Sequence, residues 1–536
     1  MEFVLLNLNR VNFSASILID ELTLRFLFTI SLIRIRVITF SNYYLNTEQF
    51  SIRFHLILFL FITSIFLIIV RANLVITILG WDGLGLRSYF LVTYYNNKKS
   101  SNAGILTVLR NRIGDGFLIL TIIYLLSYGD WQIKFYHYFI YNNLIIILLI
   151  LGCFTKSAQI PFRAWLPAAI AAPTPVSALV HSSTLVTAGV YLLIRHESIF
   201  SQFRLIFIII VGLLTTTIAS FRALLEIDLK KIVALSTLSQ LGFIVISLGF
   251  QEFYLAYIHL IAHAFFKALL FLRAGLIIHN SSSCQDLRFI NQSFLRTPVR
   301  SLATVIALIR LCGIPFITSF YSKETIIESS LINRKFIWIY LILIINVGLT
   351  LRYRIKFLII GTINQSLKNF LLLTNEKNYF YLWRIWILLL PAFLAGYRIN
   401  FLFLNKALFI KVPQLIKLLT ILVLRLRLII RYNLFIKLKK YKFSVSKNSI
   451  ITIWILHYLS TYVFTQVSLK LLKWLIVITE FIILSNFLNY LIIKLNFISL
   501  KKTNYAINSN LYWKNLYTVI ILLCLTVLFF VYLNSL

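Results

Sequence analysis

The chain has 536 residues, of which 60% are hydrophobic, and its mean hydropathy is +0.89. A soluble chain of this length would divide into domains with polar surfaces, which this composition excludes. The formal charge of +36 comes from 52 lysines and arginines against 16 acids. These charges form no basic domain or patch interleaved with aromatic residues, so nucleic acid is not an expected partner, and basic loops that orient the chain and contact anionic lipid explain the charge better.

Apolar runs recur from residue 17 to residue 533, and about 14 of them approach the ~20 residues that a helix needs to cross a bilayer. Membrane-spanning strands would need a series of short alternating stretches, which the sequence lacks. We therefore expect an all-α polytopic membrane protein of about 14–15 transmembrane helices. The expected parts are an N-terminal transmembrane region (1–60), a core (61–400), further transmembrane helices (401–464), a long apolar helix (465–505) and a C-terminal anchor (511–536). The start, MEFVLLNLNR, lacks a basic, Ser-rich presequence, which fits synthesis inside the compartment that uses the protein.

The prolines are distributed unevenly along the core. Four of the eight fall within 15 residues, at Pro161, Pro167, Pro173 and Pro175. Proline inside a helix removes a backbone hydrogen bond, so we expect a discontinuous helix over 150–172. A second interruption, CGIPFITSFYSKE, occupies residues 312–324. Two broken helices are typical of a transporter built from repeats, with its site near the breaks.

The stretch HLIAHAFFKALLF at residues 259–271 is otherwise apolar, yet it carries His259, His263 and Lys267. These three are four residues apart, so on a helix they lie along one face. Ionisable side chains at bilayer depth are costly and indicate a functional site. Others lie at the ends or in the middle of apolar segments: Asp82, Arg112, Asp115, Lys156, His181, Glu226, Asp228, Lys230, Lys231, Lys323 and Glu324.

The motifs that other kinds of chemistry require do not accompany these side chains. The sequence has no nucleophile–base pair, no phosphate loop and no nucleotide fingerprint, and GWDGLG is not a G-x-G-x-x-G loop. His259 and His263 have the spacing of a zinc helix without its glutamate and third ligand, and the four cysteines form no CxxC pair. We therefore expect this chain to bind neither a metal nor a cofactor.

A proton path fits them better, because it needs groups that exchange protons near ambient pH. Burial lowers the pKa of a lysine, a nearby carboxylate raises it again, and the pKa of histidine lies near neutrality. The predicted relay, with water between its members, comprises Asp82, Lys156, His181, Lys231, His259, His263, Lys267 and Lys323.

Each of these side chains has a structural alternative, either as a helix-end group that reaches the membrane surface or as one member of a satisfied ion pair. We favour that alternative for Glu226, Asp228 and Lys230. For Lys156 and Lys267, which lie deep in apolar sequence, we favour function.

Several of these motifs resemble one family. GWDGLG, NRIGD, the stretch from KSAQIPF to VTAGVYLLIR, DLKKIVALSTLSQLGF, HLIAHAFFKALLF and GIPF…FYSKE are similar to the chain 5 family of NADH–ubiquinone oxidoreductase, the distal antiporter-like membrane subunits of mitochondrial respiratory complex I. The resemblance runs from about residue 20 to residue 400. It implies two inverted five-helix repeats with a discontinuous helix in each, then a lateral helix and a transmembrane anchor. It also implies proton translocation driven by electron transfer elsewhere in the complex.

The resemblance assigns roles by motif position. Asp82 resembles the acid that pairs with a central lysine, and Lys156 resembles that lysine, although the family more often has glutamate at position 82. Arg112 and Asp115 resemble an ion pair at the subunit boundary. The central axis and the last half-channel would be formed by His181, His259, His263, Lys267 and Lys323.

The resemblance also implies a setting for the chain. NADH, FMN, iron–sulfur clusters and ubiquinone would be bound by other subunits of the complex. The expected partners are the other membrane-arm subunits, especially the neighbouring antiporter-like one, and membrane lipids with cardiolipin among them. The expected location is the mitochondrial inner membrane, with the chain encoded in the organelle.

Two other functions stay open. One is a structural arm whose own channel is idle, and unchanged proton stoichiometry in Lys156→Ala or Lys267→Ala would favour it. The other is a subunit of a cation/proton antiporter, a class that resembles this family closely. Transport by the isolated chain would favour the antiporter.

The largest departures from the family are arginines in apolar segments, where relatives carry small or uncharged residues: Arg87, Arg110, Arg163, Arg273 and Arg310. An arginine at the centre of a spanning helix costs on the order of 3 kcal/mol on insertion. The chain also has a single methionine, Met1. Invertebrate mitochondrial codes read AGA and AGG as serine and AUA as methionine, whereas other codes give arginine and isoleucine. Our hypothesis is that these positions were translated with the wrong code, and the alternative is a genuine, unusually basic variant.

Overall fold

The computed structural model describes residues 2–358 with the exception of 9–10, 47, 72, 127–142, 197–201, 281–283, 288–297, 313–317 and 333–336. All of these residues belong to one compact unit, Met1–Trp454. The predicted segments 401–464, 465–505 and 511–536 lie outside the described residues, and so does the interruption at Gly313 and Pro315.

The predicted helical membrane fold is confirmed. In chain order the helices are α1 (Glu21–Tyr44), α2 (Ser51–Val70), α3 (Leu74–Val92), α4 (Lys98–Leu126), α5 (Asn143–Lys156), α6 (Trp165–Ala168), α7 (Thr174–Leu179), α8 (Leu185–Arg195), α9 (Gln202–Leu225), α10 (Leu229–Gly249), α11 (Phe253–Asn280), α13 (Pro298–Cys312), α14 (Thr318–Ile332) and α15 (Ile337–Leu358).

The N-terminus departs from the expected all-α structure. Strands β1 (Glu2–Leu8) and β2 (Val11–Ser16) pair as an antiparallel hairpin, with an irregular register between Val4 and Leu6. The sequence VNFSAS alternates apolar and polar residues, which is the strand period. This segment is also too short for a membrane-spanning helix, and the first described segment that is long and apolar enough to span is Ser51–Val70.

The start of α1 is held by a capping box and an ion pair. The backbone N–H of Asp20 donates to Thr23 Oγ1 at 2.8 Å, and the Asp20 side chain in turn caps the first turn. Arg195 at the end of α8 donates to Asp20 Oδ2, also at 2.8 Å. The beginning of α1 is therefore tied to a helix 175 residues further along the chain.

Six segments of the described part are long and apolar enough to cross a membrane: Ser51–Val70, Leu74–Val92, Thr174–Arg195, Leu205–Leu225, Leu229–Gly249 and Phe253–His279. The apolar windows of Thr174–Arg195 and Leu229–Gly249 are wholly buried in the protein, whereas those of α2 and α3 are 44% buried. A helix that is apolar on every side belongs inside a large protein, so α10 is internal and α2 and α3 are peripheral.

The discontinuous helix predicted over 150–172 is confirmed. Helix α5 ends at Lys156, and after an irregular segment α6 begins at Trp165, followed by the 3₁₀ turn η2 (Ala169–Ala171). Helix α8 crosses this break closely at Gly189, where a Cβ would lie 2.6 Å from the Cys153 carbonyl oxygen. Glycine at this position lets α8 pack against the end of α5.

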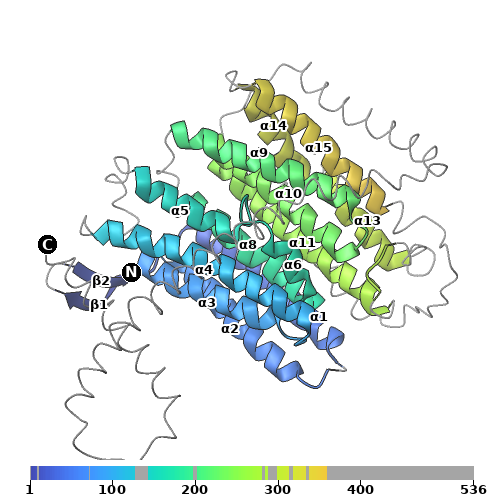
Figure 1. Cartoon of the computed structure of the whole chain (residues 1–536), viewed down its shortest axis with the longest axis horizontal. Helices are drawn as coiled ribbons and strands as arrows, with labels where there is room; N and C mark the ends of the chain where they lie inside the picture. The colour runs from blue at the N-terminus through green and yellow to red at the C-terminus, as the bar shows by residue number, and fades with distance from the viewer. Residues whose placement is uncertain are drawn as a thin grey trace, which may run out of the picture. The chain divides into compact units, whose positions relative to one another are not determined.

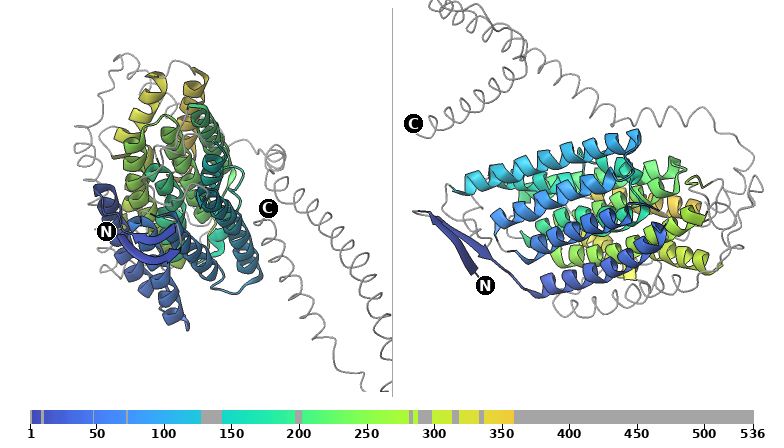
Figure 2. Two further views of the ribbon diagram at one scale, coloured as in Figure 1. Left: turned by 90° about the vertical axis from the view of Figure 1, so that its left-hand side faces the viewer. Right: turned by 90° about the horizontal axis from the view of Figure 1, so that it is seen from below.

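Helices α10 and α11 lie at the centre of the unit. Figure 1 shows α2, α3 and α4 on one side of them and α14 and α15 on the other, and Figure 2 shows the helices running side by side. Helix α10 packs against α9 and α11, and α11 packs against α1, α7, α13 and α14.

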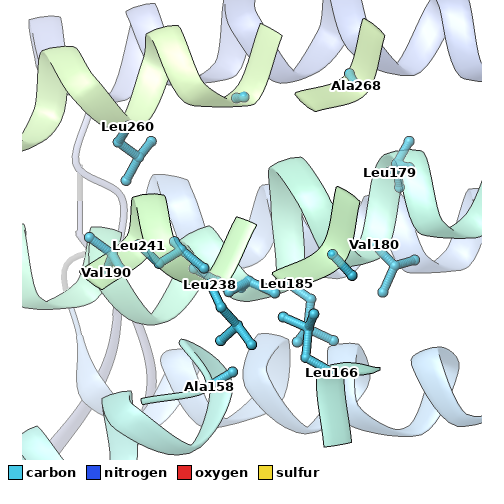
Figure 3. Packing of buried hydrophobic residues seen from close by; sticks show 14 of the residues in the cluster. Ala158, Leu166, Leu179, Val180, Leu185, Val190, Leu238, Leu241, Leu260 and Ala268 are labelled. Atoms are coloured by element: carbon cyan, nitrogen blue, oxygen red, sulfur yellow. The ribbon is translucent and has the colours of Figure 1, made fainter. Parts of the chain in front are cut away.

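The core around these helices is apolar. In Figure 3, Leu238 and Leu241 of α10 lie beside Leu185 and Val190 of α8, with Leu260 of α11 on the other side. All five side chains are buried in one continuous cluster. Any ionisable group among them is therefore kept from bulk water.

Candidate functional site

Lys156 is fully buried at the last turn of α5, immediately before the break. Its Nζ donates a hydrogen bond of 2.5 Å to the carbonyl oxygen of Trp81 on α3. The same Nζ lies 4.0 Å from the centre of the Trp81 ring, within cation–π range. The lysine is thus held against α3, the helix that carries Asp82.

Two carboxylates and an arginine complete this Lys156 cluster. Arg112 Nη1 contacts Asp82 Oδ1 at 2.7 Å and Asp115 Oδ2 at 3.5 Å, so the predicted Arg112–Asp115 ion pair is present and Asp82 is the closer partner. The Asp115 side chain is 6% exposed and that of Asp82 is 37% exposed. Both carboxylates belong to the electrostatic surroundings of the buried Lys156. The resemblance assigns Asp82 as the acid that pairs with Lys156, and this assignment stays a prediction.

His181 lies in a π-helical turn, η3 (Val180–Thr184), between α7 and α8. Its ring centre is 6.0 Å from that of Trp165, in an edge-on arrangement. The side chain is 1% exposed, and neither ring nitrogen has a hydrogen-bond partner among the described residues. Single π turns in helices are frequent at functional sites.

The lysine pair at the start of α10 divides between surface and interior. Lys231, the predicted relay member, has a side chain that is 40% exposed and forms an ion pair with Asp228 three residues earlier. Lys230 is 5% exposed, and its Nζ donates to the carbonyl oxygen of Ala172 at 3.4 Å. The buried lysine is therefore the neighbour of the predicted one, and it contacts the end of the broken segment.

His259, His263 and Lys267 lie on one face of α11, as predicted, and none is more than 2% exposed. Lys267 Nζ donates to Ser236 Oγ and, at 3.4 Å, to the Val233 carbonyl oxygen, both on α10. The positive charges of Arg354 and Lys323 belong to the electrostatic surroundings of Lys267.

The row continues to Lys323 on α14. His259 Nδ1 hydrogen-bonds with Ser322 Oγ at 2.8 Å, which places the end of the α11 row next to Lys323. Lys323 Nζ donates to the carbonyl oxygen of Leu311 on α13 and lies 5.9 Å from the centre of the Phe243 ring. We define the Lys267 cluster as Lys267, His263, His259, Lys323 and the side chains that contact them.

Sequence reasoning missed several polar side chains of the Lys267 cluster. Ser239 Oγ lies 3.1 Å from the Tyr353 hydroxyl oxygen on α15, which accepts from Arg354 Nη2 at 3.2 Å. Arg354 Nη1 donates to the Leu311 carbonyl oxygen that Lys323 also uses. A serine or tyrosine in an apolar helix is too common to be singled out by sequence. Arg354 in VGLTLRYRIKF could have been found, because it is an ionisable residue in an apolar segment.

The structure places three of the five unexpected arginines, Arg87, Arg110 and Arg163, at half-buried positions. Arg110 lies over the Phe162 ring at 5.8 Å. Arg273 differs, because it is fully buried on α11, six residues after Lys267. The side chain of Arg310 lies outside the described residues.

The site as a whole is a set of buried lysines and histidines along spanning helices. Within the described ranges no group of three His, Cys, Asp or Glu side chains is arranged to hold a metal ion. Helices of this length with buried ionisable rows define a polytopic membrane protein with ionisable side chains in its interior.

Comparisons with known proteins identify the family. The family described as "NADH:quinone oxidoreductase/Mrp antiporter, TM" matches residues 72–350. NADH-ubiquinone oxidoreductase chain 5 of Aedes aegypti is 42% identical over 431 residues, covering 79% of this chain and 74% of the relative. The same protein of Locusta migratoria is 41% identical over 425 residues, covering 78% and 74%. The chain belongs to the NADH-ubiquinone oxidoreductase chain 5 family.

A solved structure supports the fold. A chain in the structure of an Mrp complex from Dietzia sp. matches with a TM-score of 0.66 at 22% sequence identity. The match covers 97% of this chain and 59% of that chain. This chain therefore spans less than two thirds of its structural neighbour, and at this identity the likeness concerns the fold alone.

Proposed function

We propose that this chain translocates protons across the mitochondrial inner membrane as a membrane-arm subunit of respiratory NADH:ubiquinone oxidoreductase. The observation that carries the proposal is the burial of five ionisable side chains, none more than 2% exposed, in helical segments of the core: Lys156, His181, His259, His263 and Lys267. Burying such groups at membrane depth costs free energy, so their presence there indicates a functional role such as transport. The family membership supports the same function.

The relay runs between the Lys156 cluster and the Lys267 cluster. Lys156 exchanges protons under the influence of Asp115 and Asp82. His181 and the start of α10 lie between the clusters in chain order, and there we assign the relay position to Lys230 in place of Lys231. The burial of Lys230 and its contact with the Ala172 carbonyl support this assignment. Lys231 is half-exposed and paired with Asp228, so it can exchange protons directly with the solvent.

In this function the chain has no redox site of its own. Electron transfer takes place in other subunits, which bind NADH, FMN, iron–sulfur clusters and ubiquinone. The partners are the neighbouring membrane-arm subunits and the surrounding lipids, with cardiolipin among them. Exposed apolar side chains of α2 and α3, such as Ile52, Leu56 and Leu79, fit a lipid surface.

The test is Lys267→Met in the assembled complex, because methionine keeps the length of the side chain and removes its charge. The complex is reconstituted into liposomes, and proton uptake and NADH oxidation are measured together. We expect fewer protons per electron, with Lys231→Met as the matched control that keeps the normal ratio. An unchanged ratio in Lys267→Met would reject the relay and leave a structural arm with an idle channel.

Cation/proton antiport is the second candidate, and the Mrp part of the family description favours it. The same buried lysines and acids would then alternate between protons and a metal cation. Liposomes that contain the chain, loaded with sodium and given a pH gradient, distinguish the two. Sodium movement without NADH oxidation supports the antiporter, and its absence supports the respiratory subunit.

A further inference from the structure

Helices α10 and α11 form an antiparallel pair with a defined register. The pair is joined by a short turn between Gly249 and Phe253, and Lys267 donates to Ser236 across the interface. In an antiparallel pair, residues that lie opposite each other have residue numbers with a nearly constant sum. The two ends of the turn and the Ser236–Lys267 contact both fit this rule. Continuing this register by one helical turn brings Gln240 opposite His263.

The same two residues also lie on the facing sides of their helices. Gln240 is four residues after Ser236 on α10, and His263 is four residues before Lys267 on α11, so each shares a face with a residue of the known contact. Both are internal, since Gln240 is 0% exposed and His263 is 2% exposed.

Both side chains have unused hydrogen-bonding capacity. Within the described part of the chain, neither Nε2 nor Oε1 of Gln240 has a partner, and neither do Nδ1 and Nε2 of His263. A buried polar group without a partner is destabilising, so an amide and an imidazole that the register places opposite each other in this state call for a shared ligand. Water fits, because it donates and accepts at once and needs two to four polar partners.

We propose that Gln240 is a positioning residue of the proton path, which holds with His263 a buried water between Lys267 and His259. The inference rests on the proposed function and deepens it, since it names the group that joins the lysine to the histidines. The amide takes no proton itself. Its Oε1 accepts from the water and its Nε2 donates to it, which orients the water towards the imidazole.

The transfer is balanced at every step. An N–H bond of the Lys267 ammonium breaks as an O–H bond forms on the water, and the water gives one of its other protons to a ring nitrogen of neutral His263. The imidazolium then passes its proton to His259, one turn earlier on the same face, whose Nδ1 is already bonded to Ser322. The charge moves towards Lys323 without gain or loss of atoms.

The test compares three variants of the full chain in the assembled, reconstituted complex. Gln240→Leu removes both polar atoms at nearly constant volume, and Gln240→Asn keeps them on a shorter side chain. The matched control is Thr237→Val on the same helix, where the hydroxyl donates to the carbonyl oxygen of Ala234. The measured quantities are protons moved per electron and the solvent isotope effect on the coupled rate.

We expect Gln240→Leu to slow proton transfer by about tenfold or more, because a misplaced relay group is costly, and to change the solvent isotope effect. Gln240→Asn restores part of the rate, and Thr237→Val changes neither quantity. A Gln240→Leu complex that behaves like Thr237→Val while Lys267→Met loses protons would overturn this inference alone. A Lys267→Met complex with the normal ratio would instead reject the proposed function.

A second measurement decides the matter if Gln240→Leu does not assemble. A structure of the unmodified complex that shows ordered waters should contain one within hydrogen-bond distance of both the Gln240 amide and the His263 ring. A direct amide–imidazole contact with no water there would overturn the proposal.

Discussion

The two lysine clusters of this chain differ in the chemical groups that surround the lysine. Lys156 has the carboxylates of Asp115 and Asp82 within electrostatic range and lies over an aromatic ring. Lys267 donates to a serine hydroxyl and a backbone carbonyl, and the positive charges of Arg354 and Lys323 act on it. Coulomb interactions between such groups are strong where water is excluded. In the proposed function we therefore expect the first cluster to hold a proton more tightly than the second.

The difference also concerns how each cluster is connected. The Lys156 cluster is centred on ion pairs, which Arg112 shares between two acids. The Lys267 cluster is extended by neutral groups: Lys267 donates to the Ser236 hydroxyl, and Ser239 Oγ donates to the Ser236 carbonyl oxygen and lies in contact with the Tyr353 hydroxyl on α15. Neutral hydroxyls can reorient without a large electrostatic cost, whereas charged pairs resist rearrangement. The comparison leads to different expectations for matched substitutions.

The largest expected difference is in assembly. Lys156→Ala leaves Asp115 buried with one positive partner fewer, and the loss of a member of a buried charged group costs about 3 kcal/mol or more. Lys267→Ala removes a positive charge from a positive neighbourhood and is better tolerated. The measurement is the fraction of each variant recovered in the assembled complex. Recovery of Lys156→Ala by adding Asp115→Asn would confirm the ion-pair explanation, and equal losses for both lysines would contradict it.

The two acids of the first cluster are expected to differ next. Asp115→Asn removes a carboxylate that is 6% exposed, whereas the one removed by Asp82→Asn is 37% exposed. Exposed charges are screened by water, so the loss of proton transfer should be about tenfold larger for Asp115, which corresponds to about 1.4 kcal/mol. Proton uptake per electron in the two complexes checks this. A larger effect at Asp82 would return the main role to the acid that the motif indicated.

Sequence reasoning was accurate where a pattern has one physical meaning. Apolar runs of about 20 residues form spanning helices, clustered prolines break a helix, and a four-residue spacing puts His259, His263 and Lys267 on one face. It was wrong for residues 2–16, because the same apolar composition hides a strand alternation in so short a segment. Sequence reasoning also did not predict which residues of other helices contact the lysines. The packing that brings α15 or α4 next to a lysine depends on the tertiary structure.

The pair Lys230 and Lys231 shows the limit most clearly. Adjacent residues on a helix point about 100° apart, so one of two lysines at a helix start can be internal while the other meets the surface. Sequence alone does not say which, because the direction of the core is set by α9 and α11. The structure makes Lys230 the internal one.

This assignment predicts a smaller, selective effect. Lys231→Ala breaks an exposed ion pair, which contributes about 1 kcal/mol at most, and should leave proton transfer unchanged. Lys230→Ala should lower proton uptake per electron while the complex still assembles, because its contact is a single carbonyl oxygen at 3.4 Å. Both are measured in reconstituted vesicles. Loss of pumping in Lys231→Ala with normal pumping in Lys230→Ala would restore the assignment made from sequence.

The last prediction alters no residue and concerns the charges of the second cluster. Arg273 is fully buried on the helix of Lys267, a position that is costly for arginine and ordinary for serine. We expect peptide mass spectrometry of the native chain to show serine at position 273, with no tryptic cleavage after it. The same digest reports on Arg354, which acts on Lys267. A peptide that ends at 273 would contradict the code hypothesis, and the Lys267 cluster would then keep every positive charge that distinguishes it from the Lys156 cluster.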